Sequence, residues 1–340
     1  MSARARILDA IRAGEPLSRV ELAGRTGLTE AAVSTTVRKL LDEGLVLETG
    51  RSPSGGKPRT LLRLDPAARV AVGIHHDGNR IIYVLTGQTG GVLARLATPA
   101  TGTLTAGVER LLQVAGVDRG RCLGVGLASP GAPPPDEIAG LPVLSEDQAT
   151  AAAVGAYWVE RVEPERPFAA LYLGTAFGAG VVLDGRARPA GFGHVCVRVD
   201  GPECWCGARG CLEAMAGPRT VVAAAGAEGD ARDVPAAFAA VARQARSGPG
   251  PSRELLETSA EYAAAAAETT VNLFGVDLLV LTGPGFAAAS FVYGPAIARR
   301  IRVADARTWK RSVTVTVSPA ATIAAATGAA ALVLQSHLTA

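Results

Sequence analysis

The chain has 340 residues, of which 48% are hydrophobic but only 4% are aromatic. That length allows two or three domains, and their cores must be mainly aliphatic. The net charge of +3 lies wholly in residues 1–65, which hold 11 basic and 8 acidic residues, while the remainder holds 23 of each. A small basic module on a neutral body suits nucleic-acid binding. Polar or charged residues interrupt the apolar stretches, so we expect a cytoplasmic protein without a membrane span.

Residues 1–65 predict a winged helix-turn-helix domain. After a first amphipathic helix, Ser18 and Glu21 have the spacing of a capping box that starts a second helix. Gly27 is placed to end that helix as a turn residue, and Thr29 is placed to cap a third. Apolar residues recur along one stripe of the third helix, so its opposite, polar face is expected to be exposed.

Two short extended runs, 45–48 and 60–64, follow the third helix and enclose a glycine-rich basic loop, which together predict a wing. Two helices joined by a short glycine turn place the second of them in the major groove of DNA. The alternative is a plain three-helix bundle with a solvated charged face, which requires neither the turn nor the wing. We predict that double-stranded operator DNA is bound by Ser18, Thr29, Glu30, Ser34, Thr35, Arg38, Lys39, Lys57 and Arg59.

Beyond a short junction at 65–68, strand-like and helical stretches alternate to the end of the chain. Runs at 70–74, 81–85 and 92–96 predict a β-meander, because glycine-containing turns separate them. A long alanine-rich helix is expected at 257–274. The alternation predicts an α/β body with two lobes and a cleft between them.

Four residues in a short segment carry metal-binding chemistry. His194 stands ten residues before Cys204, and Cys206 and Cys211 follow closely. Three thiolates and one imidazole make a closed tetrahedral zinc set with no position left for a reactive water, so a zinc ion here is expected to be structural. The alternative is a cluster of buried or oxidised cysteines. Two further cysteines in extended or apolar runs are expected in the core: Cys122 and Cys196.

The ligand pattern continues through Gly193, Gly207, Gly210 and Glu213, and glycine-rich runs occur at 124–131, 173–180 and 283–285. Together these motifs resemble the ROK family of repressors, open reading frames and kinases, and the N-terminal domain resembles that of its regulator branch. The resemblance implies a two-lobed, actin-like fold of sugar-kinase type in residues 66–340. Lobe one is expected at about 66–160 plus 320–340, and lobe two at about 161–319 with the zinc loop. The resemblance also implies a homo-oligomer, either a dimer or a tetramer.

Four positions depart from the pattern of the family's kinases. His75 and Asn79 stand at the phosphate-binding positions, Gln148 at that of the general base, and Gly191 at that of a sugar-binding glutamate. A neutral imidazole does not replace a carboxylate toward Mg²⁺, and an amide has no basic pair to accept a proton. A one-residue shift of the comparison would put Asp147 at the base position, although the neighbouring matches oppose that shift.

We therefore expect a DNA-binding transcriptional regulator, a repressor rather than an enzyme, whose cleft takes a small-molecule effector. The resemblance implies that the effector contacts Asp147, Gln148, His194 and Glu213. Glu213 equally suits a carboxylate at a helix start. Two alternatives stay open: an ATP-dependent sugar kinase fused to a DNA-binding module, and a regulator with a non-sugar effector or none.

Overall fold

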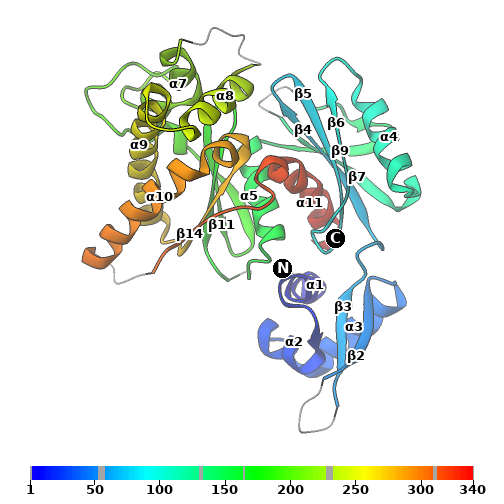
Figure 1. The fold of residues 1–340 in the computed structure, drawn as a ribbon. Coiled ribbons are helices and arrows are strands. Elements are labelled where there is room, and N and C mark those ends of the chain that lie inside the picture. The colour runs from blue at the N-terminus through cyan, green and yellow to red at the C-terminus, as the bar shows by residue number, and fades with distance from the viewer. Residues whose placement is uncertain are drawn as a thin grey trace.

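The computed structural model describes residues 2–52, 58–129, 133–163, 165–226, 233–308 and 312–339. Two lobes lie side by side, and a small N-terminal domain lies beneath the first of them (Figure 1). The predicted combination of a winged helix-turn-helix with a two-lobed α/β body is confirmed. Across the described ranges, no helix is both long enough and apolar enough to cross a membrane.

The N-terminal domain packs three helices against a small sheet with strand order β1-β3-β2. Its elements are α1 (Ala3–Gly14), β1 (Leu17–Ser18), α2 (Arg19–Thr26), α3 (Glu30–Asp42), β2 (Val46–Arg51) and β3 (Thr60–Leu64). The sequence pattern missed β1, because two residues are too few for a periodicity and only pairing with β3 defines the strand. Aliphatic side chains from all three helices and the sheet form one core.

Local signals set the turn between α2 and α3. The Ser18 hydroxyl accepts a hydrogen bond from the Glu21 amide at 3.4 Å, and the Glu21 carboxylate accepts one from the Ser18 amide at 2.8 Å. This is the predicted capping box. Gly27 ends α2 with a left-handed φ of 63°, a conformation that favours glycine. The tight turn follows from these residues.

The first lobe contains a six-stranded sheet in the order β6-β5-β4-β7-β9-β8. The strands are β4 (Val70–Asp77), β5 (Arg80–Gly87), β6 (Val92–Pro99), β7 (Cys122–Ala128), β8 (Glu137–Ile138) and β9 (Leu141–Glu146). The predicted meander is antiparallel, whereas β7 runs parallel to β4 and β9 parallel to β7. Helix α4 (Leu104–Ala115) covers one face, with Val108 and Leu111 fully buried.

The second lobe contains a five-stranded sheet in the order β12-β11-β10-β13-β14. The strands are β10 (Phe168–Leu173), β11 (Phe177–Leu183), β12 (Arg186–Ala190), β13 (Leu278–Thr282) and β14 (Thr314–Val317). The helices are α6 (Leu212–Ala216), α7 (Pro218–Ala224), α8 (Val234–Arg246), α9 (Pro251–Phe274) and α10 (Gly283–Thr308). Their apolar faces share the lobe's main core with one face of the sheet.

Two alanine-rich helices lie between the sheets, α5 (Gln148–Val159) on the second and α11 (Ala324–Thr339) on the first (Figure 1). Their backbones touch: a Cβ added at Gly328 would lie 1.6 Å from the carbonyl oxygen of Ala151. One added at Gly155 would lie 2.1 Å from the carbonyl oxygen of Ala324. Helix α5 therefore covers the sheet of lobe two, although the sequence division placed it in lobe one; the exact lobe boundary stays a prediction.

Candidate DNA interface, metal centre and cleft

Helix α3 presents a polar face away from the core of the winged helix. Thr29 caps it, because its hydroxyl oxygen accepts a hydrogen bond from the amide of Ala32 at 3.2 Å. The exposed residues predicted to contact DNA are Thr29, Glu30, Thr35, Arg38 and Lys39, and Ser34 is partly buried beside them. Within the described ranges, neither cation of this set takes part in an ion pair, so both are available to phosphates.

The remaining predicted DNA contacts fall elsewhere. Ser18 is 1% exposed, and its hydroxyl donates to the Glu21 carboxylate at 2.7 Å while it also accepts from the Glu21 amide. Its position gives it a capping role and does not bring it to the exposed face of α3. Arg59 is exposed just before β3, at the base of the wing. Lys57 lies outside the described residues.

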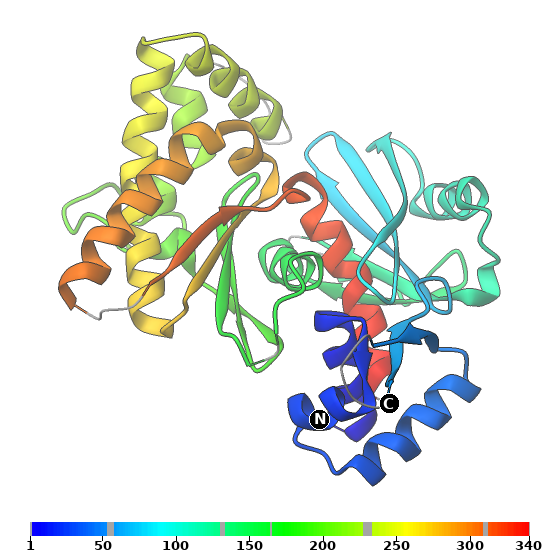
Figure 2. The ribbon, with the colours of Figure 1, turned by 60° about the horizontal axis from the view of Figure 1, so that its bottom comes forward.

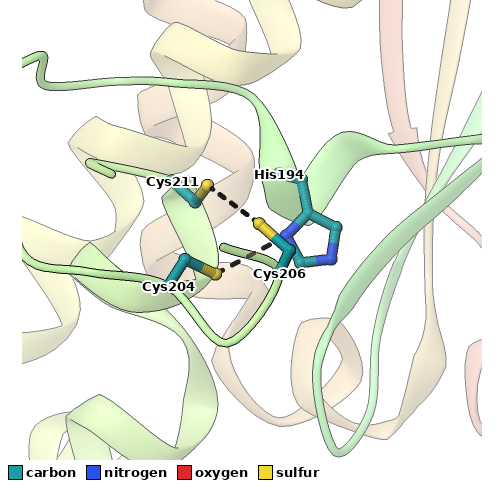
Figure 3. Close-up of side chains that lie close together, drawn as sticks. All are labelled: His194, Cys204, Cys206 and Cys211. Carbon is teal, nitrogen blue, oxygen red and sulfur yellow. Dashed lines mark hydrogen bonds between the residues drawn. The ribbon is translucent and has the colours of Figure 1, made fainter. Parts of the chain in front are cut away.

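The four predicted metal ligands converge. Figure 3 shows the His194 imidazole facing the three thiols, with 3.6 Å between its Nδ1 and the Sγ of Cys204. The Sγ atoms of Cys206 and Cys211 lie 3.7 Å apart, and all four donor atoms lie within 4.8 Å of one another. Tetrahedral zinc with bonds of about 2.0–2.3 Å sets its ligand atoms about 3.4–3.8 Å apart. The donor set and spacing therefore fit a zinc ion.

Glycines allow the ligands to meet over so short a segment. Gly207 has a φ of 89° and Gly210 a φ of 67°, both in the left-handed region. At Gly210 an added Cβ would also lie 1.5 Å from the Arg198 carbonyl oxygen, so only glycine fits. Cys196 is exposed and pairs through its backbone with Cys211. Its predicted core position is wrong, because the segment edges the metal loop, whereas Cys122 is buried as expected.

The crowded thiols differ in acidity. A hydrogen bond with the backbone of Ala208 lowers the pKa of the exposed Cys206 thiol, whereas burial raises the pKa of Cys211. A bound divalent cation stabilises the thiolate form of every cysteine that ligates it. A zinc ion bound here would therefore favour deprotonation of all three thiols.

His75, near the end of β4, meets Tyr172 of β10 where the two lobes face each other, and both residues are buried. The imidazole Nε2 lies 3.2 Å from the tyrosine hydroxyl, and the two rings meet edge to face. Burial lowers the pKa of His75 to about 4, so the ring is neutral at pH 7. The Asn79 amide, in the turn between β4 and β5, donates a hydrogen bond to the carboxylate of Asp233 before α8, which joins the two lobes. A neutral hydrogen-bonded pair thus fills the position where the kinases' aspartate is expected.

Asp147 and Gln148 begin α5 on the other side of His75. The Asp147 carboxylate caps the helix by accepting hydrogen bonds from the amides of Ala149 and Thr150, at 2.9 and 3.0 Å. The Gln148 amide donates to the carbonyl oxygen of His76 at 3.3 Å. Both hydrogen bonds go to Oδ1, so one oxygen of the Asp147 carboxylate is engaged in capping the helix.

Glu213 is buried beside the metal loop, at the start of α6. Its carboxylate accepts a hydrogen bond from the Phe177 amide at 2.8 Å, which ties α6 to the hairpin between β10 and β11. Burial raises the pKa of Glu213 to about 7, although that hydrogen bond opposes the shift. Gly178, next to Phe177, packs against Ala149 of α5. The predicted effector residues Asp147, Gln148 and Glu213 therefore flank the same end of β11, while His194 turns its ring toward the thiols.

A buried polar contact, which we call the latch, joins the winged helix to the body. Arg12 of α1 is 1% exposed, and its guanidinium bonds the Asp9 carboxylate at 2.8 Å and the carbonyl oxygens of Tyr157 and Val162 at 3.3 Å each. The Tyr157 hydroxyl donates to the other Asp9 oxygen at 2.9 Å, and the guanidinium carbon lies 4.2 Å from the Tyr157 ring centroid. Both ends of this ion pair are thus satisfied across the domain boundary.

Sequence reasoning missed the latch and Tyr172. The signal for the latch was present, because Asp9 and Arg12 are charged residues at i, i+3 on the apolar side of an amphipathic helix. Charges at such positions need a partner, but that partner stands 145 residues or more along the chain. Tyr172 lay in an ordinary buried strand pattern, so only the contact with His75 distinguishes it.

The protein thus combines a winged helix-turn-helix, a type of domain that binds DNA, with a two-lobed body of sugar-kinase type that carries the metal loop. Residues 136–336 match the model of the ROK family, and residues 2–57 match that of the MarR family. The chain therefore belongs to the ROK family and carries a MarR-type winged helix-turn-helix at its N-terminus. The family resemblance predicted from the sequence is confirmed.

Three relatives define the similarity. The xylose repressor of Bacillus subtilis is 25% identical over 253 residues, which are 64% of this chain and 66% of that protein. A ROK family transcriptional regulator, described as a homolog of the E. coli MLC protein, matches with a TM-score of 0.70 and 21% identity over 98% of this chain and 96% of its own. A ROK family glucokinase from Streptomyces griseus, solved with glucose and AMPPNP, matches with a TM-score of 0.60 and 22% identity. The match covers 77% of this chain and 98% of the glucokinase.

These matches support different conclusions, because their coverage and identity differ. Those to the first curated relatives cover 57–66% of the relatives' own length. Both solved structures are less than 25% identical to this chain, so they show the shared fold. The match to the regulator covers 98% of this chain and therefore includes the winged helix as well as the body, whereas the match to the glucokinase covers 77%.

Proposed function

We propose that this chain is a DNA-binding transcriptional regulator that acts as a repressor. The observation that carries the proposal is the exposed polar face of α3, with Arg38 and Lys39 free of ion pairs among the described residues, on a helix that a glycine turn holds for entry into a major groove. The similarity to a xylose repressor, and to a ROK regulator over 98% of this chain, supports it.

The body has a sensing role in this proposal and does not phosphorylate sugars. Gln148 provides no basic atom at the general-base position, and Asp147 next to it caps α5 through its Oδ1. The neutral His75 offers no carboxylate to Mg²⁺. The cleft instead binds a small-molecule effector, whose preference for one lobe arrangement shifts the position of the winged helix.

The zinc ion of the proposal is structural. Its four ligands come from the protein, so none of its tetrahedral positions is open to a substrate. The loop from His194 to Cys211 leads directly into α6, whose Glu213 holds the hairpin at the cleft. Zinc therefore fixes the start of α6 and, through it, one wall of the cleft.

The regulator works as a homo-oligomer. Two copies place two α3 helices on half-sites about 34 Å apart, one turn of B-DNA. A pseudo-palindromic operator matches that symmetry, and an effector that changes the separation of the helices changes the affinity.

The test is fluorescence anisotropy with the DNA upstream of the chain's own gene and a scrambled duplex of equal length, across a salt series. We expect a preference of at least ~10³-fold for the native duplex near ~0.15 M salt. The variant Ser34→Ala/Arg38→Ala should lose that preference, whereas Arg243→Ala, which removes an exposed arginine from α8, should keep it. Equal, salt-sensitive binding to both duplexes would contradict the proposal.

The sugar kinase remains the second candidate, because the fold matches a glucokinase solved with glucose and AMPPNP. An assay of ADP release over hexoses and N-acetylhexosamines separates the two functions. We expect no turnover above a protein-free control, and clear turnover that is lost in Asp147→Asn would establish the kinase instead.

A further inference from the structure

A cavity of about 800 Å³ lies between the winged helix and the second lobe, away from the cleft. We call it the interdomain cavity. One wall is formed by α1 and the last turn of α2, and the other by the chain after α5 and the hairpin that joins β11 to β12. Small-molecule sites commonly have about 300–1,000 Å³ and occur at domain interfaces. The size and position of this cavity are therefore those of a ligand site.

The two walls are held together by bonds that cross the domain boundary. The latch buries Arg12 against Tyr157, directly beside the cavity wall at Asp9. Arg25 of α2 and Glu163, which both line the cavity, lie 3.4 Å apart, and outside the lining Arg161 lies 3.3 Å from the Glu15 carboxylate. Figure 2 shows α1 alongside the end of α11, a contact that adds to this docking. The cavity is therefore a feature of the docked protein with fixed walls.

The charges that line the cavity sort into engaged and free groups. Asp9 is engaged through both oxygens, and Arg25 is engaged with Glu163. Three lining arginines form no ion pair within the described ranges: Arg6, Arg186 and Arg188. Two lining acids are likewise unpaired among described residues: Glu165 and Asp184. The free charge is thus one unit positive, and the arginines come from both walls.

This arrangement selects a chemical class of ligand. Guanidinium groups bind carboxylate or phosphate oxygens with paired, charge-assisted hydrogen bonds. The two free carboxylates accept hydrogen bonds from hydroxyl groups. We propose that the interdomain cavity is a second ligand site that binds a small hydroxylated organic anion, with its acidic group on Arg6, Arg186 and Arg188 and its hydroxyl groups toward Glu165 and Asp184.

Arg186 and Arg188 are the positions that test the proposal. They stand two residues apart on β12, where both side chains are exposed and point to the same face of the strand. Arg186 also lines a second cavity of about 420 Å³, which shares Asp9 of α1 with the first. Because neither side chain contributes to a core, their removal should leave the fold intact, which a melting curve checks.

The experiment is isothermal titration calorimetry of the full-length, zinc-loaded protein with citrate and with glycerol 3-phosphate, at constant ionic strength. Citrate presents carboxylates and glycerol 3-phosphate a phosphate, so the probe that binds identifies the acidic group; glycerol is the uncharged control. We expect saturable binding of at least one anion with a Kd below roughly 10 mM. The variant Arg186→Ala/Arg188→Ala should weaken it at least about tenfold, and Arg186→Lys/Arg188→Lys by less.

Arg243→Ala, on the far side of the second lobe, is the matched control and should bind as the wild type does. Failure of both anions to bind would overturn the proposal, as would binding that the double alanine variant leaves unchanged. Because no DNA enters the assay, these outcomes are independent of whether the chain is a regulator.

Discussion

Removing the latch should have a local and measurable effect. Replacing Arg12 by alanine deletes the bonds to the carbonyl oxygens of Tyr157 and Val162 and the stacking on the Tyr157 ring, all of which cross the domain boundary. It also removes the cationic partner of the Asp9 carboxylate, which is 9% exposed and keeps only the hydrogen bond from the Tyr157 hydroxyl. The variant therefore leaves a buried, half-satisfied charge.

Removing one member of a buried ion pair costs about 3–5 kcal/mol. Replacing both members by apolar residues of similar size costs far less, so Asp9→Leu/Arg12→Met should be more stable than Arg12→Ala. The pair Arg19–Glu48 offers a contrast in the same domain, because its side chains are 33% and 48% exposed. Arg19→Ala should therefore cost less than about 1 kcal/mol.

Hydrogen exchange measured by mass spectrometry resolves the effect by segment, which matters because a multidomain chain need not unfold in one step. In Arg12→Ala the amides of α1 (Ala3–Gly14) should lose more than about a hundredfold of their protection, as 3 kcal/mol implies, while α9 keeps its own. A loss of protection no larger in Arg12→Ala than in Arg19→Ala would refute the reasoning.

Three further predictions follow from the body. Gly328→Ala should lower the free energy of unfolding in urea by about 1–3 kcal/mol or more, because the new methyl group meets the backbone of α5. Gly294→Ala in α10 is the control: its methyl group enters open space, so it should be neutral or stabilising. Equal effects of the two substitutions would contradict the packing described. The buried Glu213 has a pKa of about 7 in the folded state, above its value of 4.5 in the unfolded state. Its contribution to the free energy of unfolding is therefore fully present below pH 4.5 and is lost as the pH rises through 7. The wild type should lose about 3 kcal/mol of its free energy of unfolding by pH 9 through this group, and Glu213→Gln should not. If both proteins showed the same dependence of stability on pH, the raised pKa of Glu213 would be refuted. Cys206→Ser should abolish stoichiometric zinc by atomic absorption and lower the melting temperature, whereas Cys196→Ser should do neither; zinc retained in Cys206→Ser would refute the ligand set.

What the sequence predicted well is local. The capping box at Ser18, the left-handed Gly27 and the cap at Thr29 each depend on residues within a few positions, so they could be inferred without tertiary contacts. The metal loop was predictable for the same reason, because three of its ligands lie within eight residues. Glycines at 207 and 210 supply the positive φ angles that the spacing required.

What the sequence did not reveal depends on partners far along the chain. Arg12 and Tyr157 are 145 residues apart, and no periodicity connects them. The apolar run around Cys196 suggested a core position, but the backbone there pairs with the metal loop, which leaves the thiol at the surface. Likewise, the alanines of α5 carry no amphipathic stripe, because the helix is buried on nearly every side between two sheets and α11.

Helix α5 has a further consequence, because its two ends have different neighbours. Asp147 caps its first turn, where Gln148 bonds the carbonyl oxygen of His76, and its last turn supplies Tyr157 to the latch. Twelve helical residues form a rod about 18 Å long, so a tilt of about 10° displaces the far end by about 3 Å. The rod has no loop or hinge along its length to absorb such a tilt. One rigid helix therefore connects the surroundings of His75 to the contact that docks the winged helix, and α11 packs against the middle of that helix.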